Sequence, residues 1–445
     1  MIVKSRDRTR CLVGAAIIGA SASAVLVAAA LAAVADGYET PPTAEPAAVL
    51  PPDLVSGGNF HVVSPVASDG LMHHFDLETP FGQFTAYGRV ALAARVREVE
   101  ALTTLSKTSK IQVVAGGIGH GIASNVETVA HVATHPIGTV IGIPRGIAHL
   151  FHGAVDQSKE AVSDAKKSTQ ASTGDKSSGD AQSPSARTTR DDAAKRYAKR
   201  YFGVTAAERH WYQKLGVDPY TDNAVLTDAI RRTAKVEAAA GFGMKFAGLP
   251  AIPGIGMLRR AEDAIYNENP ATIRMRTRKT LETYGLTPPE VDRFSNSTLI
   301  SPTRQVQLVQ AAEALQGVDG RAEIFRHAVG LTSDAEAQVY LHSVGLLVLA
   351  HHKQPVASLL AGVRLPSARR ADGHVVVCGA FEAVYWTGDV DRGEQQVREA
   401  LPTEGITGRE LWLSGGLSDK ARAVLAERGW IVVDAAGVEP GRPES

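Results

Sequence analysis

Cysteine is nearly absent from this chain of 445 residues, which contains only two. Cys11 precedes a long apolar run, and Cys378 stands alone in the apolar stretch "HVVVCGAF". A lone thiol in the body of the chain has no partner for an internal disulfide, and its apolar neighbours predict a buried, unreactive side chain. A disulfide framework and a cysteine-based zinc knuckle are therefore excluded, and the fold must depend on its hydrophobic core.

An excess of charge of either sign is also missing. Lys plus Arg and Asp plus Glu both number 47, which gives a formal net charge of zero. A nucleic-acid-binding protein normally concentrates basic residues on one face. The closest approach to this is "RMRTRK" at 274–279, whose alternating basic residues would spread around a helix and predict a solvated face. Nucleic acid is therefore not an expected partner.

The N-terminus carries the pattern of an export signal. A basic stretch, "MIVKSRDRTR", precedes residues 11–35, which contain no charge, and Ala33 and Ala35 occupy the small-residue positions of a cleavage site. The apolar run also exceeds the roughly 20 residues that a membrane-spanning helix needs. A signal peptide and an uncleaved membrane anchor are both open. In either case we expect an exported protein, periplasmic or extracellular, whose N-terminal segment anchors it if it is not cleaved.

Composition divides the chain into segments of different character. Residues 36–57 are rich in proline and alanine, and residues 163–192 contain almost no side chains that could be buried. The pattern predicts a mainly α fold with a short N-terminal β-hairpin and a small C-terminal α/β domain that contains a βαβ unit. The expected divisions are a signal peptide or membrane anchor (1–35), a spacer (36–57), a hairpin plus helical region (58–162), a disordered linker (163–192), a helical domain (193–352), a small α/β domain (353–438) and a tail (439–445).

Local signals predict several individual elements. Apolar residues alternate over 71–77 before the turn "TPFG", which indicates a hairpin, and the period changes to that of a helix over 89–105. An apolar stretch at 339–350 is too short to span a bilayer and predicts a core helix. Three capping boxes are expected, and they are Thr205 with Glu208, Thr287 with Glu290, and Ser333 with Glu336.

Histidine gathers in "HVATHPIGTVIGIPRGIAHLFH" at 131–152. If 118–135 forms one helix and a second begins at 147, the hairpin would place a nitrogen-rich set of side chains along one seam, suited to zinc or a similar divalent metal. The candidate ligands are Glu127, His131, His135, His149 and His152. Two observations weaken this interpretation, because no glutamate follows the first histidine of "HVATH" and a proline follows the second. A solvated polar stripe is the favoured alternative, and contact with a membrane surface or a partner is the third.

The stretch "SGGLS" lies between a predicted strand and a capped helix, where backbone N–H groups can hold an anion. Its candidate residues are Ser414, Gly415, Gly416 and Ser418. A tight turn that needs glycine explains the same pattern and is favoured. No G-x-S-x-G elbow is present, and the glycines of "GGIGHGIAS" do not follow G-x-G-x-x-G order, so neither a serine hydrolase nor a dinucleotide-binding loop is indicated.

Together these patterns predict an exported cell-envelope protein with a non-catalytic binding or scaffolding role. The expected partner is another envelope protein or a membrane surface, and no cofactor is expected. A metal-dependent hydrolase that uses the histidine-rich hairpin is one alternative, and an anion-binding module at the 414–418 turn is another.

Overall fold

The computed structural model describes residues 37–108, 184–240 and 264–434. About 52% of this structure is helix and 17% is strand, and the strands form several sheets. These proportions confirm the expectation of a mixed fold in which helix predominates. Among the residues described, no helix combines the length and the apolar character needed to cross a membrane. The predicted signal or anchor at 1–35 lies outside the described residues.

The N-terminal unit is an antiparallel sheet with one long helix on it. The expected hairpin is present, because β4 (His73–Thr79) and β5 (Gly82–Tyr87) pair antiparallel over their whole length. Phe75 and Leu77 alternate with exposed positions along β4 and face the core, where α4 (Arg89–Thr108) covers them. The other strands are β1 (Ser56–Gly57), β2 (Phe60–Val62) and β3 (Ala67–Ser68).

The middle of the chain is helical, as predicted. Its helices are α8 (Pro184–Tyr201), α9 (Ala206–Leu215), α10 (Ala224–Ala240), α12 (Pro270–Thr283), α13 (Pro288–Ser295), α14 (Pro302–Ala314), α15 (Ala322–Val329) and α16 (Asp334–Lys353). The capping boxes at Thr205 and Thr287 are confirmed. The third differs, because Ser333 caps α16 but the Glu336 carboxylate accepts from the backbone N–H of Thr332, at 2.6 Å, rather than from that of Ser333.

The C-terminal sheet has helices on both faces. Its strands are β6 (Ser358–Leu359), β7 (Ser367–Arg369), β8 (His374–Gly379), β10 (Gly408–Leu413) and β12 (Trp430–Asp434), in the order β12-β10-β8-β7-β6. Strands β8, β10 and β12 are parallel to one another, whereas β7 pairs antiparallel with both β8 and β6. Val376 and Cys378 pack in the same core as α16, whereas Val375 and Val377 face α17 (Gly388–Ala400) and α18 (Asp419–Glu427). Burial on both faces explains why "HVVVCG" is continuously apolar rather than alternating.

The expected βαβ unit, β10–α18–β12, is present, and Ser418 caps its helix. A second unit, β8–α17–β10, precedes it along the chain. Cys378 is fully buried in this sheet, and that burial raises the pKa of its thiol, in agreement with an unreactive side chain.

Two predicted connecting segments contain more structure than expected. The proposed spacer at 36–57 includes α2 (Pro46–Val49) and α3 (Pro52–Val55), and its first residues pack against the C-terminal domain. Proline suits the first turn of a helix as well as an extended chain, so composition alone did not separate the two. Helix α8 begins at 184, inside the predicted linker at 163–192, and the rest of that linker lies outside the described residues.

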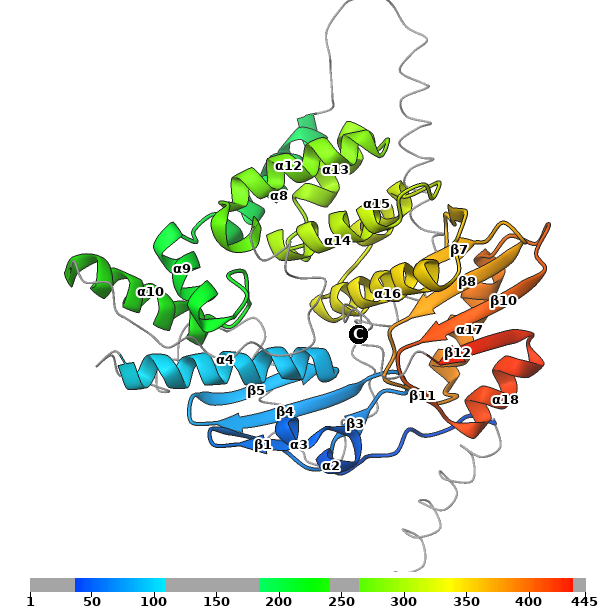
Figure 1. Cartoon of the computed structure of the whole chain (residues 1–445), viewed down its shortest axis with the longest axis horizontal. Coiled ribbons are helices and arrows are strands. Elements are labelled where there is room, and N and C mark those ends of the chain that lie inside the picture. The colour runs from blue at the N-terminus through cyan, green and yellow to red at the C-terminus, as the bar shows by residue number, and fades with distance from the viewer. Residues whose placement is uncertain (1–36, 109–183, 241–263, 435–445) are drawn as a thin grey trace, which may run out of the picture.

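Figure 1 shows how these parts are arranged. Helix α16 lies between the N-terminal unit and the C-terminal sheet, and the other helices of the middle region, α8 to α15, extend away from the sheet. The hairpin β4–β5 approaches the edge of the C-terminal sheet at which its parallel strands end, and there the two units meet.

Candidate functional site

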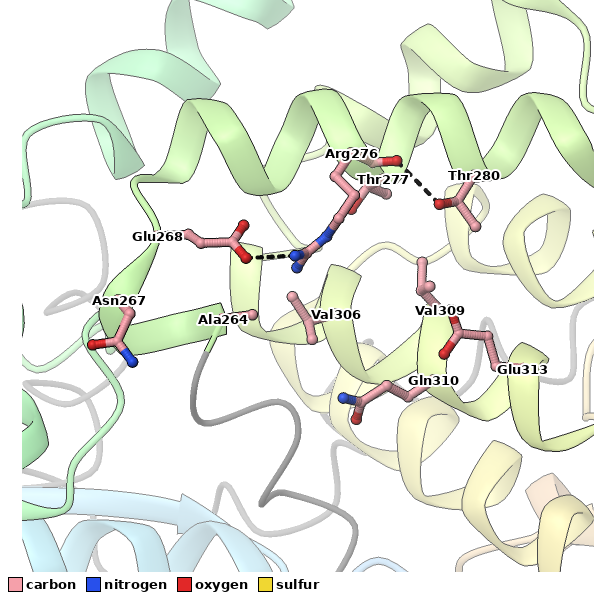
Figure 2. Close-up of a pocket in the computed structure, with 10 residues that line it drawn as sticks. All are labelled: Ala264, Asn267, Glu268, Arg276, Thr277, Thr280, Val306, Val309, Gln310 and Glu313. Carbon is pink, nitrogen blue, oxygen red and sulfur yellow. Dashed lines mark hydrogen bonds and ion pairs between the residues drawn. The ribbon is translucent and has the colours of Figure 1, made fainter.

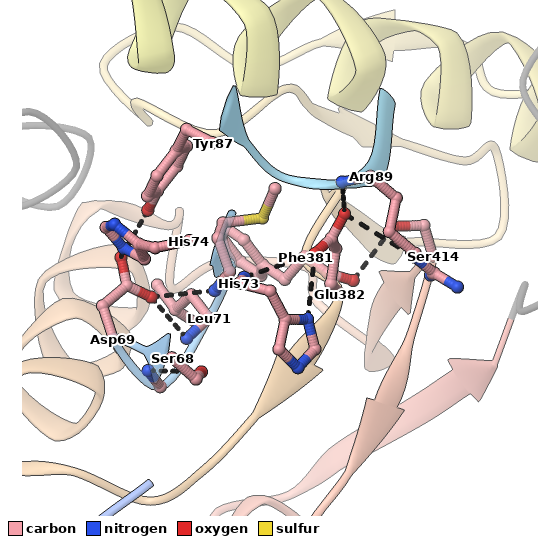
Figure 3. A network of polar contacts seen from close by, with 12 residues as sticks. Ser68, Asp69, Leu71, His73, His74, Tyr87, Arg89, Phe381, Glu382 and Ser414 are labelled. Atoms are coloured by element: carbon pink, nitrogen blue, oxygen red, sulfur yellow. Dashed lines mark hydrogen bonds and ion pairs between the residues drawn. The ribbon is translucent and has the colours of Figure 1, made fainter. Parts of the chain in front are cut away.

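Polar side chains gather at the carboxyl ends of the parallel strands, the edge at which open α/β sheets usually hold their ligands. Glu382 follows β8, and Ser414 follows β10. Beyond them the short strands β9 (Ala383–Val384) and β11 (Gly416–Leu417) pair in parallel. Residues from the N-terminal unit meet this edge, and we call the resulting cluster the junction network; it consists of Asp69, His73, His74, Tyr87, Arg89 and Glu382 (Figure 3).

Glu382 joins the two units. Its side chain is 7% exposed, and its Oε2 accepts from the backbone N–H of His73 at 3.3 Å and lies 3.0 Å from Nδ1 of the same residue. Its Oε1 accepts from the backbone N–H of Arg89. The backbone N–H of Glu382 donates in turn to the carbonyl of Leu71 at 2.9 Å. Both carboxylate oxygens therefore have partners from the N-terminal unit.

Asp69 organises the other half of the network. Its Oδ1 accepts from the backbone N–H groups of Leu71 and Met72 at 2.9 and 2.8 Å, and its Oδ2 accepts from the hydroxyl of Tyr87 and lies 3.4 Å from His74 Nε2. Burial by itself would raise the pKa of Asp69, but the hydrogen bonds from His74, Tyr87 and Met72 outweigh it and lower that pKa. Burial, reinforced by the negative charge of Asp69, raises the pKa of Tyr87 well above its usual value.

The turn predicted to bind an anion lies beside this network. Ser418 caps α18 by accepting from the backbone N–H of Ala421 at 3.0 Å. Its hydroxyl donates to the Glu39 carboxylate at 2.5 Å, and the backbone N–H of Trp386 donates to the same oxygen. An anionic group of the chain itself thus stands at the start of α18, where the helix dipole favours negative charge.

The other three residues of that turn make contacts within the fold. Ser414 donates its hydroxyl to the carbonyl of Phe381 at 3.0 Å. A Cβ at Gly415 would lie 2.0 Å from the carbonyl oxygen of Glu382, so only glycine permits this close approach of the two loops. Gly416 begins β11. These contacts agree with the interpretation of the stretch as a tight turn, and anion binding there stays a prediction.

The predicted metal ligands cannot be placed in the same way. Glu127, His131, His135, His149 and His152 all lie within 109–183, outside the described residues. In the part of the chain that the structure describes, no three His, Cys, Asp or Glu side chains are grouped so that they could hold a metal ion.

A second polar site lies in the helical region, between α12 and α14. It is a pocket of about 590 Å³, within the range usual for small-molecule sites. Figure 2 shows Glu268 and Arg276 on one side and Glu313 on the other, with Val306 and Val309 between them. Arg276 Nη1 lies 2.5 Å from Glu268 Oε1. We call this site the α12–α14 pocket.

Sequence reasoning missed both groupings. His73 falls on the same face of the predicted hairpin as the alternating apolar residues of 71–77, and its presence on that face was the only hint of a polar partner. Glu382 follows the apolar stretch "HVVVCGAF" that contains β8, which is a second such hint. Neither pattern identifies its partner, because the two residues are 309 positions apart.

Comparison with known proteins adds no assignment, because no protein-family model, curated protein or solved structure matches this chain.

Proposed function

We propose that this chain is an exported protein of the cell envelope whose role is binding or scaffolding rather than catalysis. The observation that carries the proposal is the junction network. At the edge of the sheet where an α/β enzyme would keep its reacting groups, both oxygens of Glu382 are bound by the N-terminal unit. The hydroxyl of Ser414 is bound by a carbonyl, and that of Ser418 by Glu39.

This use of side chains favours assembly of the chain over chemistry on a substrate. A nucleophile or general base needs a lone pair directed at the substrate, and a general acid needs a proton directed at it. The acidic and hydroxyl groups at this edge instead direct their lone pairs and protons at other parts of the fold, and these contacts hold the N-terminal unit against the C-terminal sheet. Two units held together by such contacts suit a protein that presents surfaces to a partner.

Export is supported by the sequence of the first 35 residues, with a basic start, an uncharged run and small residues at the cleavage positions. The experiment is a fusion of the full chain to a reporter enzyme that is active only outside the cytoplasm. We expect reporter activity with the full chain and its loss when residues 1–35 are deleted. Equal activity of the two fusions would contradict export.

Metal analysis of the purified protein distinguishes this role from that of a metal-dependent hydrolase. We expect substoichiometric zinc and iron, unchanged in a His131→Ala, His135→Ala variant. One equivalent of zinc or iron that is lost in this variant would favour the metal-dependent hydrolase instead.

A further inference from the structure

We propose, resting on the binding role proposed above, that the α12–α14 pocket binds a small zwitterion, a free amino acid or short peptide. Its carboxylate would be held by Arg276 and its ammonium group by Glu313. The proposal is carried by a guanidinium with unused donors on one side of the pocket, where Arg276 pairs with Glu268, and an unpaired carboxylate, Glu313, on the other, with an apolar surface between them (Figure 2).

Arg276 has unused donors at the pocket. A guanidinium group carries five N–H donors, and the contact with Glu268 involves one nitrogen, Nη1. The side chain is 49% exposed and so is reachable from solvent. The planar fork of a guanidinium matches the geometry of a carboxylate, so an incoming carboxylate can bind the remaining nitrogens.

Glu313 supplies the opposite charge. It lines the pocket from α14 and is exposed, and it forms no ion pair with any residue that the structure describes. An ammonium group beside it would meet an unpaired carboxylate, whereas a second anion would be repelled. Glu268 offsets the charge of Arg276, so the charged lining is negative by one unit and does not repel a simple cation. A zwitterion gains more than a simple cation does, because its carboxylate can also bind the remaining donors of Arg276.

The space between these charges suits the body of such a ligand. Val306 is buried and, with Val309, offers an apolar surface. Thr277 is 3% exposed and lines the pocket, and its hydroxyl has no hydrogen-bond partner within the described segments. A hydroxyl can donate to a peptide carbonyl or accept from a peptide N–H. The volume of about 590 Å³ leaves room for more than a single small residue.

The experiment is calorimetric titration of the full-length protein with dialanine and two analogues. N-acetyl-dialanine lacks the ammonium charge, and dialanine amide lacks the carboxylate charge. Each removal should weaken binding about fivefold, because the ion pairs form at a partly exposed site. Alanine and trialanine, titrated in parallel, distinguish a free amino acid from a short peptide as the preferred ligand.

Two variants connect each charge to its residue. Glu313→Gln should weaken dialanine binding about fivefold but leave the weaker binding of N-acetyl-dialanine unchanged. Arg276→Gln should likewise weaken dialanine binding about fivefold but leave the weaker binding of dialanine amide unchanged. Glu282→Gln and Lys279→Gln are matched controls, because both residues are exposed on α12 and do not line the pocket. Unfolding curves of every variant check that the fold is intact.

Two results would overturn the proposal. One is the absence of heat with all zwitterions at millimolar concentration. The other is a loss in Glu313→Gln that is equal for dialanine and its acetylated form. Neither result bears on export or on the junction network, so failure here stays separate from failure of the proposed function.

Discussion

The junction network and the α12–α14 pocket contain the same kinds of residues, carboxylates beside a basic side chain, but their surroundings differ. In the network, the Glu382 side chain is 7% exposed and its oxygens are satisfied by groups from the same chain. In the pocket, Glu313 is exposed and Arg276 is half-exposed, and each has capacity left for a further partner. A buried charge without partners would destabilise the fold, whereas an exposed one is hydrated at little cost. The first arrangement therefore stabilises the fold, and the second is free to bind.

The largest expected effect is on the network. Replacing Glu382 with Gln removes its negative charge and turns one acceptor oxygen into a donor that faces His73 or the Arg89 N–H. We expect the free energy of unfolding to fall by about 3 kcal/mol, as for other buried charged groups that lose a partner. Urea denaturation measures the change. Glu399→Gln, at an exposed position on α17, is the matched control. A loss no greater than that of the control would mean that Glu382 does not hold the two units together.

The next effect is a dependence of stability on pH at α16. Burial, with a smaller contribution from the charge of Arg304, lowers the pKa of His342 to about 4, and Glu382 partly opposes this. As pH falls below about 6.5, the unfolded chain binds a proton that the folded chain does not bind until about pH 4, so stability is lost between these values. We expect a His342→Gln variant to lose about 2 kcal/mol less than the parent protein between pH 7.5 and pH 5. Parallel denaturation curves at the two pH values would show a common loss if His342 were not responsible.

A smaller effect is expected at Tyr87. Tyr87→Phe removes the hydroxyl that donates to Asp69 but leaves the ring in place, and the remaining contacts of Asp69 persist. We expect a loss of about 1 kcal/mol, the usual net contribution of one hydrogen bond. Because burial and Asp69 raise the pKa of Tyr87, this stabilisation is present below pH 10 and is lost as pH rises above it, when the unfolded phenol ionises first. The difference between parent and variant should therefore shrink in alkali, and a constant difference would contradict the assigned pKa shift.

The parts of the fold that sequence could predict are those built from neighbouring residues. The hairpin at 71–87, the capping boxes at Thr205 and Thr287, and the helix capped by Ser418 all depend on contacts over a few positions. The alternating "RMRTRK" was also interpreted correctly in part. Met275 is 67% exposed, and the basic residues point in different directions around α12, with Arg278 bound to Asp292 and Arg276 to Glu268.

The junction network could not be predicted because its members are brought together by tertiary packing. His73 and Glu382 are 309 positions apart, and Glu39 and Ser418 are 379 apart. Composition also misjudged the start of the body of the chain, where prolines and alanines suggested a spacer at 36–57. Tyr38 donates instead to Asp391 at 2.7 Å, and the backbone N–H of Glu39 donates to the carbonyl of Trp386 at 2.8 Å. No periodicity within a segment encodes such a contact.

The smallest expected effect tests the pocket against the network directly. Glu313→Gln should change the free energy of unfolding by less than about 0.5 kcal/mol, because the residue is exposed and lacks an ion pair in the described structure. In thermal and urea denaturation, the loss of stability in Glu382→Gln should thus be several times that in Glu313→Gln. A loss at Glu313 that approached the one at Glu382 would show that the pocket carboxylate stabilises the fold. The contrast between a structural cluster and a ligand-binding one would then fail, because both sets of charges would be engaged within the chain.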